Sequence, residues 1–213
     1  MQNRFFNYNK QIMLSTIVKI SQVTNLSDAR YCAGMGVEMI GFMIDEDSES
    51  YVSAQKVNEI RSWLMGVKIV IESQNLDAEN LLEAVEKYNP DYVQINNPYL
   101  ISSLKAKTNK PVILSIEANQ DADSIDITMQ KTASLVDYFL LESNILTTFG
   151  GDWPDFLNLL SPHYPILLGF GITPENARSL SSAGIALKGS TEIRPGFSEF
   201  GDLMDILEAV EED

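Results

Sequence analysis

Several polar side chains in this sequence stand at the ends of short apolar runs, where they could transfer protons or bind a ligand. Lys19 and Ser21 end the first such run, and Glu117 and Glu142 end two later ones. Such residues are typical of general acid–base chemistry, although a strand-end carboxylate is more often part of a structural ion pair. The other polar residues at the ends of runs are Asp45, Glu46 and Asp47, Glu72, Gln94 or Asn96, Ser115 and Lys188.

A second group of residues is suited to binding an anion. Gly169, Gly171 and Ile172 form a glycine turn, and Thr173 and Pro174 after it favour a helix start as N-cap and first helical residue. Glycines let the backbone approach an anion, and free N–H groups at a helix start bind it. The next loop along the chain adds Lys188, Gly189 and Ser190. The two loops together predict a phosphate-binding corner, with an ordinary capped helix as the alternative.

These residues are separated by a strict alternation of β-rich runs and amphipathic helical stretches. This alternation predicts a parallel sheet, and eight units favour a closed TIM (β/α)8 barrel. A doubly wound open sheet is the alternative, but no G-x-G-x-x-G follows the first strand. The predicted strands are 16–21, 39–44, 68–72, 92–96, 112–117, 138–142, 166–169 and 185–188. The predicted helices are 27–33, 53–65, 78–88, 99–107, 124–135, 153–160, 174–183 and 200–211.

The chain is interpreted as an N-terminal extension, residues 1–14, and one barrel domain, residues 15–213. His163 precedes a strand, so we expect it at the end of the barrel opposite to the chemistry. Cys32 lies within a helical stretch and is expected to be a small buried residue. Neither residue supports a Cys–His nucleophile or a zinc site. Because nothing fixes the spacing of Glu72, Glu117 and Glu142, we predict no metal and no cofactor.

Composition limits the partners of this 213-residue chain. Its formal net charge of −15 argues against nucleic acid, whose binding needs Lys and Arg. No apolar run approaches the ~20 residues of a membrane span, and no signal peptide is recognised. One cysteine allows no internal disulfide, which favours a reducing, cytoplasmic location. The expected partner is a phosphorylated small molecule, and both a monomer and a homodimer remain open.

Several segments resemble the phosphoribosylanthranilate isomerase family. Residues 19–29, KISQVTNLSDA, resemble its K-I-C-G-[IL]-T-N-x-x-D-A opening, and residues 169–176 resemble G-G-L-N-P-E-N. The resemblance covers nearly everything after residue 15, in the order of the family. The further matches are 41–42 with Ser48 and 51–53, 92–95 against V-Q-L-H-G, 140–142 against L-L-D, 152–153 against the F-D-W pair, and 192–196 against E-x-x-P-G.

The resemblance implies an Amadori rearrangement in tryptophan biosynthesis, in which an acid protonates a furanose oxygen and a base removes a proton from the neighbouring carbon. It places Ser21 at the position of the base, a cysteine in the family, and Glu142 at that of the acid, an aspartate. At the positions where the family has a substrate-binding arginine, a histidine and an aspartate of the eighth strand, this chain has Ser50, Asn96 and Ala186, respectively. The implied substrate- or phosphate-binding residues are Lys19, Asn96, Gly169, Gly171, Ile172, Lys188, Gly189 and Ser190.

Two functions stay open on the sequence. The chain is either an isomerase of this type or a catalytically degenerate or repurposed barrel that binds a phosphorylated small molecule. A serine hydroxyl is a poor base without an activating partner, so a changed enzyme would need another base, for which Glu117 or Lys19 could serve. The loop of Asp45, Glu46 and Asp47 is expected to add negative charge to the mouth.

Overall fold

The computed structural model describes residues 12–189, 191–194, 197–199 and 201–212. Eight parallel strands in this part of the chain close into a barrel in sequence order, so the predicted TIM barrel is confirmed and the open sheet is excluded. The strands are β1 (Ile17–Ser21), β2 (Met39–Met43), β3 (Lys68–Ser73), β4 (Tyr92–Ile95), β5 (Val112–Glu117), β6 (Tyr138–Glu142), β7 (Ile166–Leu168) and β8 (Gly184–Lys188).

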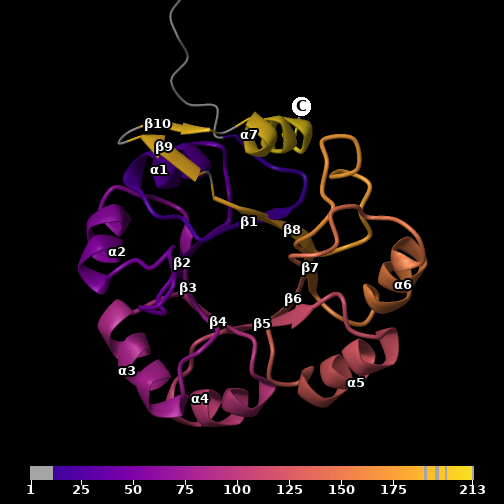
Figure 1. Ribbon diagram of the computed structural model, residues 1–213, viewed down its shortest axis with the longest axis horizontal. Helices are drawn as coiled ribbons and strands as arrows, with labels where there is room; N and C mark the ends of the chain where they lie inside the picture. Colours follow the sequence, from indigo (N-terminus) through magenta and orange to yellow (C-terminus); the bar gives the residue numbers. More distant parts are fainter. Residues whose placement is uncertain (1–11, 190, 195–196, 200, 213) are drawn as a thin grey trace, which may run out of the picture.

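Helices surround the barrel (Figure 1). Side-chain caps start several of them, since Asn25, Ser53, Asp77 and Asp121 each accept a backbone N–H at a helix start. The second helix ends at residue 61, four residues before its predicted end. The helices are α1 (Leu26–Gly34), α2 (Ala54–Arg61), α3 (Ala78–Tyr88), the 3-10 turn η1 (Pro98–Leu100) with α4 (Ile101–Lys107), α5 (Ala122–Thr132), α6 (Trp153–Leu160) and α7 (Gly201–Ala209).

The interior of the barrel changes from apolar to polar along its axis. Because side chains alternate between the two faces of a strand, every second residue points into the barrel. An apolar cluster fills the interior near the strand starts: Met39, Val70, Ile113, Leu140, Leu167 and Ala186. Two residues further along, the same strands carry Gly41, Glu72, Ser115, Glu142, Gly169 and Lys188. Polar groups therefore lie together at the C-terminal ends of the strands, where barrels of this class bind ligands.

The helix predicted over residues 174–183 is absent, and turns replace it. The N–H of Thr173 donates to Oδ1 of Asn176 (2.9 Å), and Nδ2 of Asn176 donates to the carbonyl oxygen of Gly171 (2.8 Å). The hydroxyl of Ser179 then donates to the carbonyl oxygen of Asn176 (2.9 Å). Such side chains compete with helical backbone bonds, so Thr173 caps no helix here and the predicted corner lacks a helix N-terminus.

A short antiparallel hairpin, which we did not predict, precedes the last helix. It consists of β9 (Thr191–Arg194) and β10 (Phe197–Glu199), which Figure 1 draws outside the ring of barrel strands. The sequence between β8 and α7 was interpreted as a phosphate loop because it resembles one. Two short strands with little alternation of apolar residues gave no separate signal for a hairpin.

The start of the described chain is bound to its end. The N–H of Ser15 donates to the carbonyl oxygen of Val210 (2.8 Å), and Leu14 forms an isolated antiparallel bridge with Glu211. Residues 1–11 of the predicted extension lie outside the described residues, so its boundary at residue 14 stays a prediction. In the part of the chain that the structure describes, no helix is long and apolar enough to cross a membrane.

Candidate active site at the C-terminal end of the barrel

A buried ion pair joins β1 and β3 inside the barrel. Lys19 is 0% exposed and Glu72 is 1% exposed, and Nζ of Lys19 contacts Oε1 of Glu72. The same ammonium group donates a hydrogen bond to Oγ of Ser21 (2.6 Å). The second oxygen of Glu72, Oε2, accepts the backbone N–H of Gln22 (3.1 Å). Both charges are therefore compensated, and the pair fixes the end of β1.

Two backbone positions make this arrangement fit. A Cβ atom at Gly41 would overlap Oε1 of Glu72 and would lie 3.0 Å from Nζ of Lys19. We did not predict this role, although glycine inside a strand is the expected signal of such a close approach. Gln22 has a φ of +58°, in the left-handed region that favours glycine. It stands at the position of the glycine in the K-I-C-G motif that this segment resembles.

Glu142 ends β6 and has the properties of a proton donor. Its Oε1 accepts a hydrogen bond from the hydroxyl of Ser115. Burial raises the pKa of the Glu142 carboxyl and the charge of Glu72 raises it too, while Ser115, Lys19 and Lys188 lower it. The pKa remains raised, so this carboxyl keeps its proton to higher pH than an ordinary glutamate. A carboxyl of this kind can act as a general acid.

Two more residues at this end have a buried oxygen atom without a partner among the described residues. Glu117 is in register with Glu142 on the neighbouring strand, and its Oε2 is buried. Gln94 is in register with Glu72, is 7% exposed, and its Oε1 is buried. Because buried polar atoms are normally hydrogen-bonded, these two oxygen atoms are candidates for contacting a ligand.

The remaining predicted residues of the mouth lie at its rim. Lys188 is exposed, and its Nζ donates to Oδ1 of Asn144 (2.9 Å). Asn96 follows β4 directly and is exposed, and within the described chain no hydrogen bond joins it to the buried cluster. The structure therefore brings Lys19 and Ser21 into contact and leaves Asn96 apart from them.

The turn after β7, where we predict an anion site, has a left-handed glycine. Gly171 has a φ of +63°, and a Cβ atom there would overlap the backbone nitrogen of Phe149, so the loop after β6 packs directly on it. The N–H groups of Gly171 and Ile172 donate to no group in the part of the chain that the structure describes. The N–H of Thr173 is occupied by Asn176. Two adjacent backbone donors therefore remain for an anion.

Other residues of the predicted corner have different roles. The N–H of Gly169 donates to the carbonyl oxygen of Leu141 (2.7 Å), and the N–H of Gly189 donates to that of Ser21 (2.7 Å). Both bonds extend the pairing of the barrel strands, so these two donors are not free to bind phosphate. Ser190 lies outside the described residues.

Asp45 of the acidic loop is buried, unlike the two residues that follow it. Its side chain is buried, with Oδ1 accepting the hydroxyl of Ser73 (2.6 Å) and Oδ2 accepting the backbone N–H groups of Gln74 (2.7 Å) and Asn75 (3.1 Å). Three donors compensate the carboxylate and fix the loop after β3. The exposed negative charges of the acidic loop are those of Glu46 and Asp47.

The single cysteine and histidine lie apart from the polar cluster. Cys32 is buried in α1, and burial raises the pKa of its thiol to about 12, so it is no nucleophile. His163 lies between α6 and β7, on the N-terminal side of that strand. Within the described residues, no group of three or more His, Cys, Asp or Glu could hold a metal ion.

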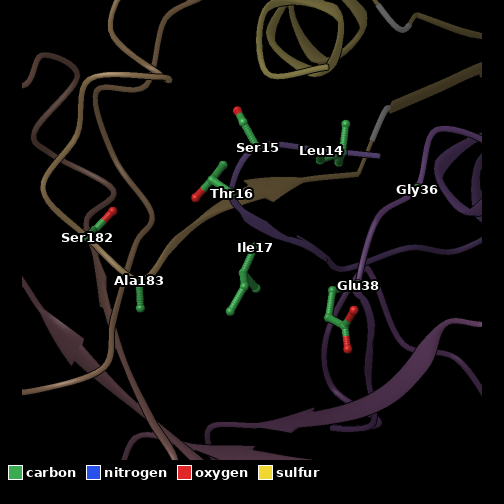
Figure 2. A pocket seen from close by; sticks show the side chains of 8 residues that line it. All are labelled: Leu14, Ser15, Thr16, Ile17, Gly36, Glu38, Ser182 and Ala183. Carbon is green, nitrogen blue, oxygen red and sulfur yellow. The ribbon is translucent and has the colours of Figure 1, made fainter. Parts of the chain in front are cut away.

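A cavity of about 420 Å³ lies at the opposite end of the barrel (Figure 2). Its walls are the start of β1 and the residues that precede β2 and β8. In this class of barrel the N-terminal end of the strands contributes to stability, whereas chemistry is found at the other end. We therefore place the candidate site at the polar C-terminal end. The cavity is lined by Leu14, Ser15, Thr16, Ile17, Gly36, Glu38, Ser182 and Ala183.

The fold and this polar end define a TIM barrel of the kind that binds small molecules at the C-terminal ends of its strands. An N-(5'-phosphoribosyl)anthranilate isomerase of Thermosynechococcus vestitus is 31% identical over 212 residues, which cover 93% of this chain and 91% of the relative. A second relative of the same name, from Methanosarcina acetivorans, is 27% identical over 192 residues, which cover 78% of this chain and 79% of the relative. No protein-family model matches the chain. The identity and coverage of the Thermosynechococcus vestitus relative nevertheless show that this chain belongs to the phosphoribosylanthranilate isomerase family.

Solved structures agree on the fold. The phosphoribosyl anthranilate isomerase of Thermus thermophilus aligns with a TM-score of 0.72 at 19% identity, covering 91% of this chain and 97% of that one. A phosphoribosyl anthranilate isomerase in complex with reduced 1-(o-carboxyphenylamino)-1-deoxyribulose 5-phosphate aligns with a TM-score of 0.73 at 20% identity, covering 92% and 98%. At such identities the likeness extends to the barrel and not to individual side chains.

Proposed function

We propose that this barrel binds a phosphorylated small molecule at its C-terminal end and isomerises phosphoribosylanthranilate very weakly or not at all. The carrying observation is the hydrogen bond from Nζ of Lys19 to Oγ of Ser21. A general base must accept a proton from the substrate, but here a cation already donates to the oxygen atom that would accept it. Lys19 is no substitute base, because it is a hydrogen-bond donor to both Ser21 and Glu72.

The acid half of the family's chemistry is better supported than the base half. Glu142 keeps a carboxyl group at the position that the resemblance assigns to the acid, and burial raises its pKa. This observation favours a second candidate function, an isomerase that retains the reaction and uses another base. Glu117 is the candidate base, because it faces the same end of the barrel beside Glu142 and has a buried, unpaired oxygen among the described residues.

Binding of a phosphate group rests on the turn after β7. The two unoccupied N–H groups of Gly171 and Ile172 can bind phosphate oxygens, and the exposed ammonium of Lys188 supplies positive charge at the rim. A structurally similar phosphoribosyl anthranilate isomerase is solved in complex with reduced 1-(o-carboxyphenylamino)-1-deoxyribulose 5-phosphate, which supports such a ligand. The site proposed here is smaller than the predicted one, since Gly189 and Thr173 contribute no free donor.

The carboxylate of anthranilate lacks a comparable partner. Ser50 offers no charge where the resemblance implies an arginine, and the exposed Glu46 and Asp47 oppose a second anion. The hydrogen bonds of Asp45 come from neutral donors, so they do not remove its charge. Substrate binding and proton abstraction should therefore both be weakened.

Thermal unfolding with and without inorganic phosphate tests the binding half of the proposal. A ligand that binds only the folded state raises the melting temperature by mass action, and Lys188→Met should reduce this shift. The matched control is Lys110→Met, which removes a half-buried lysine that contacts Asn89 instead. An equal shift in both variants would contradict the role of Lys188, and no shift in the wild type would contradict phosphate binding.

Complementation tests the catalytic half. The chain is produced in a bacterium that lacks its own isomerase, on medium without tryptophan. The proposal predicts no growth or very slow growth. Robust growth would contradict it and would support the second candidate function.

A further inference from the structure

A small pocket lies at the starts of α5 and α6, which are neighbours in the ring of helices around the barrel (Figure 1). Its volume is about 160 Å³, and the loop after β5 forms its remaining wall. We propose that this pocket binds a small organic cation, namely an aromatic ring that carries an ammonium group. The pocket uses none of the residues to which the proposed function assigns phosphate binding or catalysis.

The pocket has an apolar wall that consists mainly of aromatic rings. Trp153 and Phe156 of α6 line it and are half-buried, and Ile125 of α5 is fully buried behind them. The ring of Trp153 makes edge-to-face contacts with the rings of Phe156 (centroids 5.5 Å apart) and Phe170 (4.8 Å), which fix its orientation before a ligand binds. Since a cavity of about 150 Å³ holds one benzene ring, this pocket is large enough for a single aromatic ring.

Two exposed polar side chains, Asp152 and Gln120, complete the lining. Asp152 stands at the N-cap position of α6 but makes no capping bond, and its carboxylate accepts no hydrogen bond within the part of the chain that the structure describes. The carboxylate of Asp121, by contrast, accepts the backbone N–H (2.9 Å) and the hydroxyl (2.7 Å) of Ser124. Asp152 is therefore the carboxylate available to a ligand, and an ammonium group, which has only donors, suits it.

The charges around the pocket favour a cation over an anion. The starts of the two helices contribute only about half a positive charge each. Carboxylates at the same two helix starts outweigh this positive charge: Asp121, Asp123, Asp152 and Asp155. Of the described residues that line the pocket, none is a lysine or an arginine. An ammonium group at Asp152 would also lie beside the indole ring of the next residue, and such rings attract cations.

NMR titration with three probes of similar shape tests this inference. The probes are benzylammonium, neutral benzyl alcohol and anionic benzoate. The chain has two tryptophans, so the indole N–H signal of Trp153 reports binding, and that of the exposed Trp63 serves as an internal control. Benzylammonium should move the signal of Trp153 and leave that of Trp63 in place, and Trp63→Phe identifies the two signals.

The expected order of affinity follows from the charges. Benzylammonium should bind about 3- to 30-fold more tightly than benzyl alcohol, the range for an exposed ion pair together with a cation–π contact. Benzoate should bind least, because the carboxylates at the two helix starts repel it.

Two aspartate variants test the role of charge. Asp152→Asn keeps the shape of the side chain and suits an N-cap, so the helix should be retained. It should weaken binding of benzylammonium by about 2- to 5-fold and leave that of benzyl alcohol unchanged. Asp155→Asn is the matched control, because it removes the same charge from the same helical turn without lining the pocket. Both affinities of the control should stay near those of the wild type.

A third variant tests the position of the site. Ala122 is the exposed first residue of α5 and lines the pocket, so Ala122→Leu should fill it and prevent binding of both benzylammonium and benzyl alcohol. An unchanged melting temperature would show that this variant is folded. If it does not fold, the two aspartate variants still decide the inference.

Several results would overturn the inference. They are an unmoved Trp153 signal, equal affinity of the wild type for benzylammonium and benzyl alcohol, equal losses in Asp152→Asn and Asp155→Asn, and undiminished binding by folded Ala122→Leu. Because none of the probes carries a phosphate, these results leave the proposed function untouched.

Discussion

The β1–β3 side of the mouth and the corner between β7 and β8 differ in how they depart from the family motifs. On the first side, Glu72 pairs with Lys19, and Gly41 provides the space that this carboxylate needs. The residues there fit one another. At the corner, Gly171 has the positive φ of an anion-binding turn, but the N–H of Thr173 is occupied by Asn176. The first side is fixed by a buried charge pair, whereas the corner has a glycine turn in which one of the predicted donors is occupied.

This difference bears on the two halves of the proposed function, phosphate binding and weak catalysis. A buried lysine with its own carboxylate donates to Oγ of Ser21, and under the proposed function this contact opposes the use of Ser21 as a base. The corner still offers two backbone donors, at Gly171 and Ile172. We therefore expect this chain to bind phosphate even though its isomerase activity is very weak or absent.

The largest expected effect comes from breaking the charge pair. Lys19→Met leaves the carboxylate of Glu72 buried without its partner, so the free energy of unfolding should fall by about 3–5 kcal/mol. Urea unfolding measures the loss. The control is Lys56→Met, which breaks the exposed pair with Glu59 and should cost less than about 1 kcal/mol. A loss below about 1 kcal/mol for Lys19→Met would mean that the pair does not organise this side of the mouth.

Gly171→Ala tests the corner through the packing of its turn. The new Cβ would overlap the backbone of Phe149 in a left-handed conformation, and the expected loss is about 2–4 kcal/mol. Gly151→Ala is a matched control, because Gly151 has the same φ of +63° with no atom within 4 Å of an added Cβ. Its loss should be about 1 kcal/mol. Equal losses would show that the loop after β6 does not pack on Gly171.

Gly41→Ala tests whether the space beside Glu72 is required. The added methyl group would displace the carboxylate from Lys19, and we expect a loss of about 1–3 kcal/mol in urea unfolding. Gly34→Ala adds a methyl group with no atom within 4 Å, near the end of α1, and should be close to neutral. Wild-type stability of Gly41→Ala would contradict the proposed fit between Gly41 and Glu72.

A smaller gain is expected from Gln22→Gly. Glycine relieves the left-handed conformation at φ +58° and keeps the backbone N–H that Glu72 accepts. The greater freedom of glycine in the unfolded chain offsets part of this gain, so we expect about 0.5–1 kcal/mol of added stability. Thermal unfolding measures it, and a loss of stability would show that the Gln22 side chain has a role of its own.

The smallest effect concerns the pH dependence of stability. Burial raises the pKa of Glu142, so its contribution to stability is fully present below the unfolded value of about 4.3 and is lost as pH rises through the folded value. Glu142→Gln cannot lose a proton and can still accept from Ser115. Its melting temperature relative to the wild type should therefore be higher at pH 8 than at pH 4. An unchanged difference would contradict the raised pKa.

The sequence predicted the barrel because eight strand–helix units repeat with clear periodicity. It also predicted most of the strand-end residues, since alternation along a strand determines which residues share a face. It failed over residues 174–183, where side-chain bonds of Asn176 and Ser179 replace helical backbone bonds. It could not reveal the pairing of Lys19 with Glu72 or the burial of Asp45, because such contacts join residues far apart in the chain.

The most direct test of the central claim, that Ser21 accepts a hydrogen bond from Lys19 and does not act as a base, is kcat/KM with phosphoribosylanthranilate, followed by loss of its fluorescence. The wild type should lie at least about 10²-fold below ~10⁴ M⁻¹s⁻¹, the lower end of ordinary enzymes. Ser21→Cys together with Glu142→Asp should raise the value, because Lys19 beside a thiol favours the thiolate. A wild-type value of ~10⁴ M⁻¹s⁻¹ or more would contradict the claim and show that this barrel is a working isomerase.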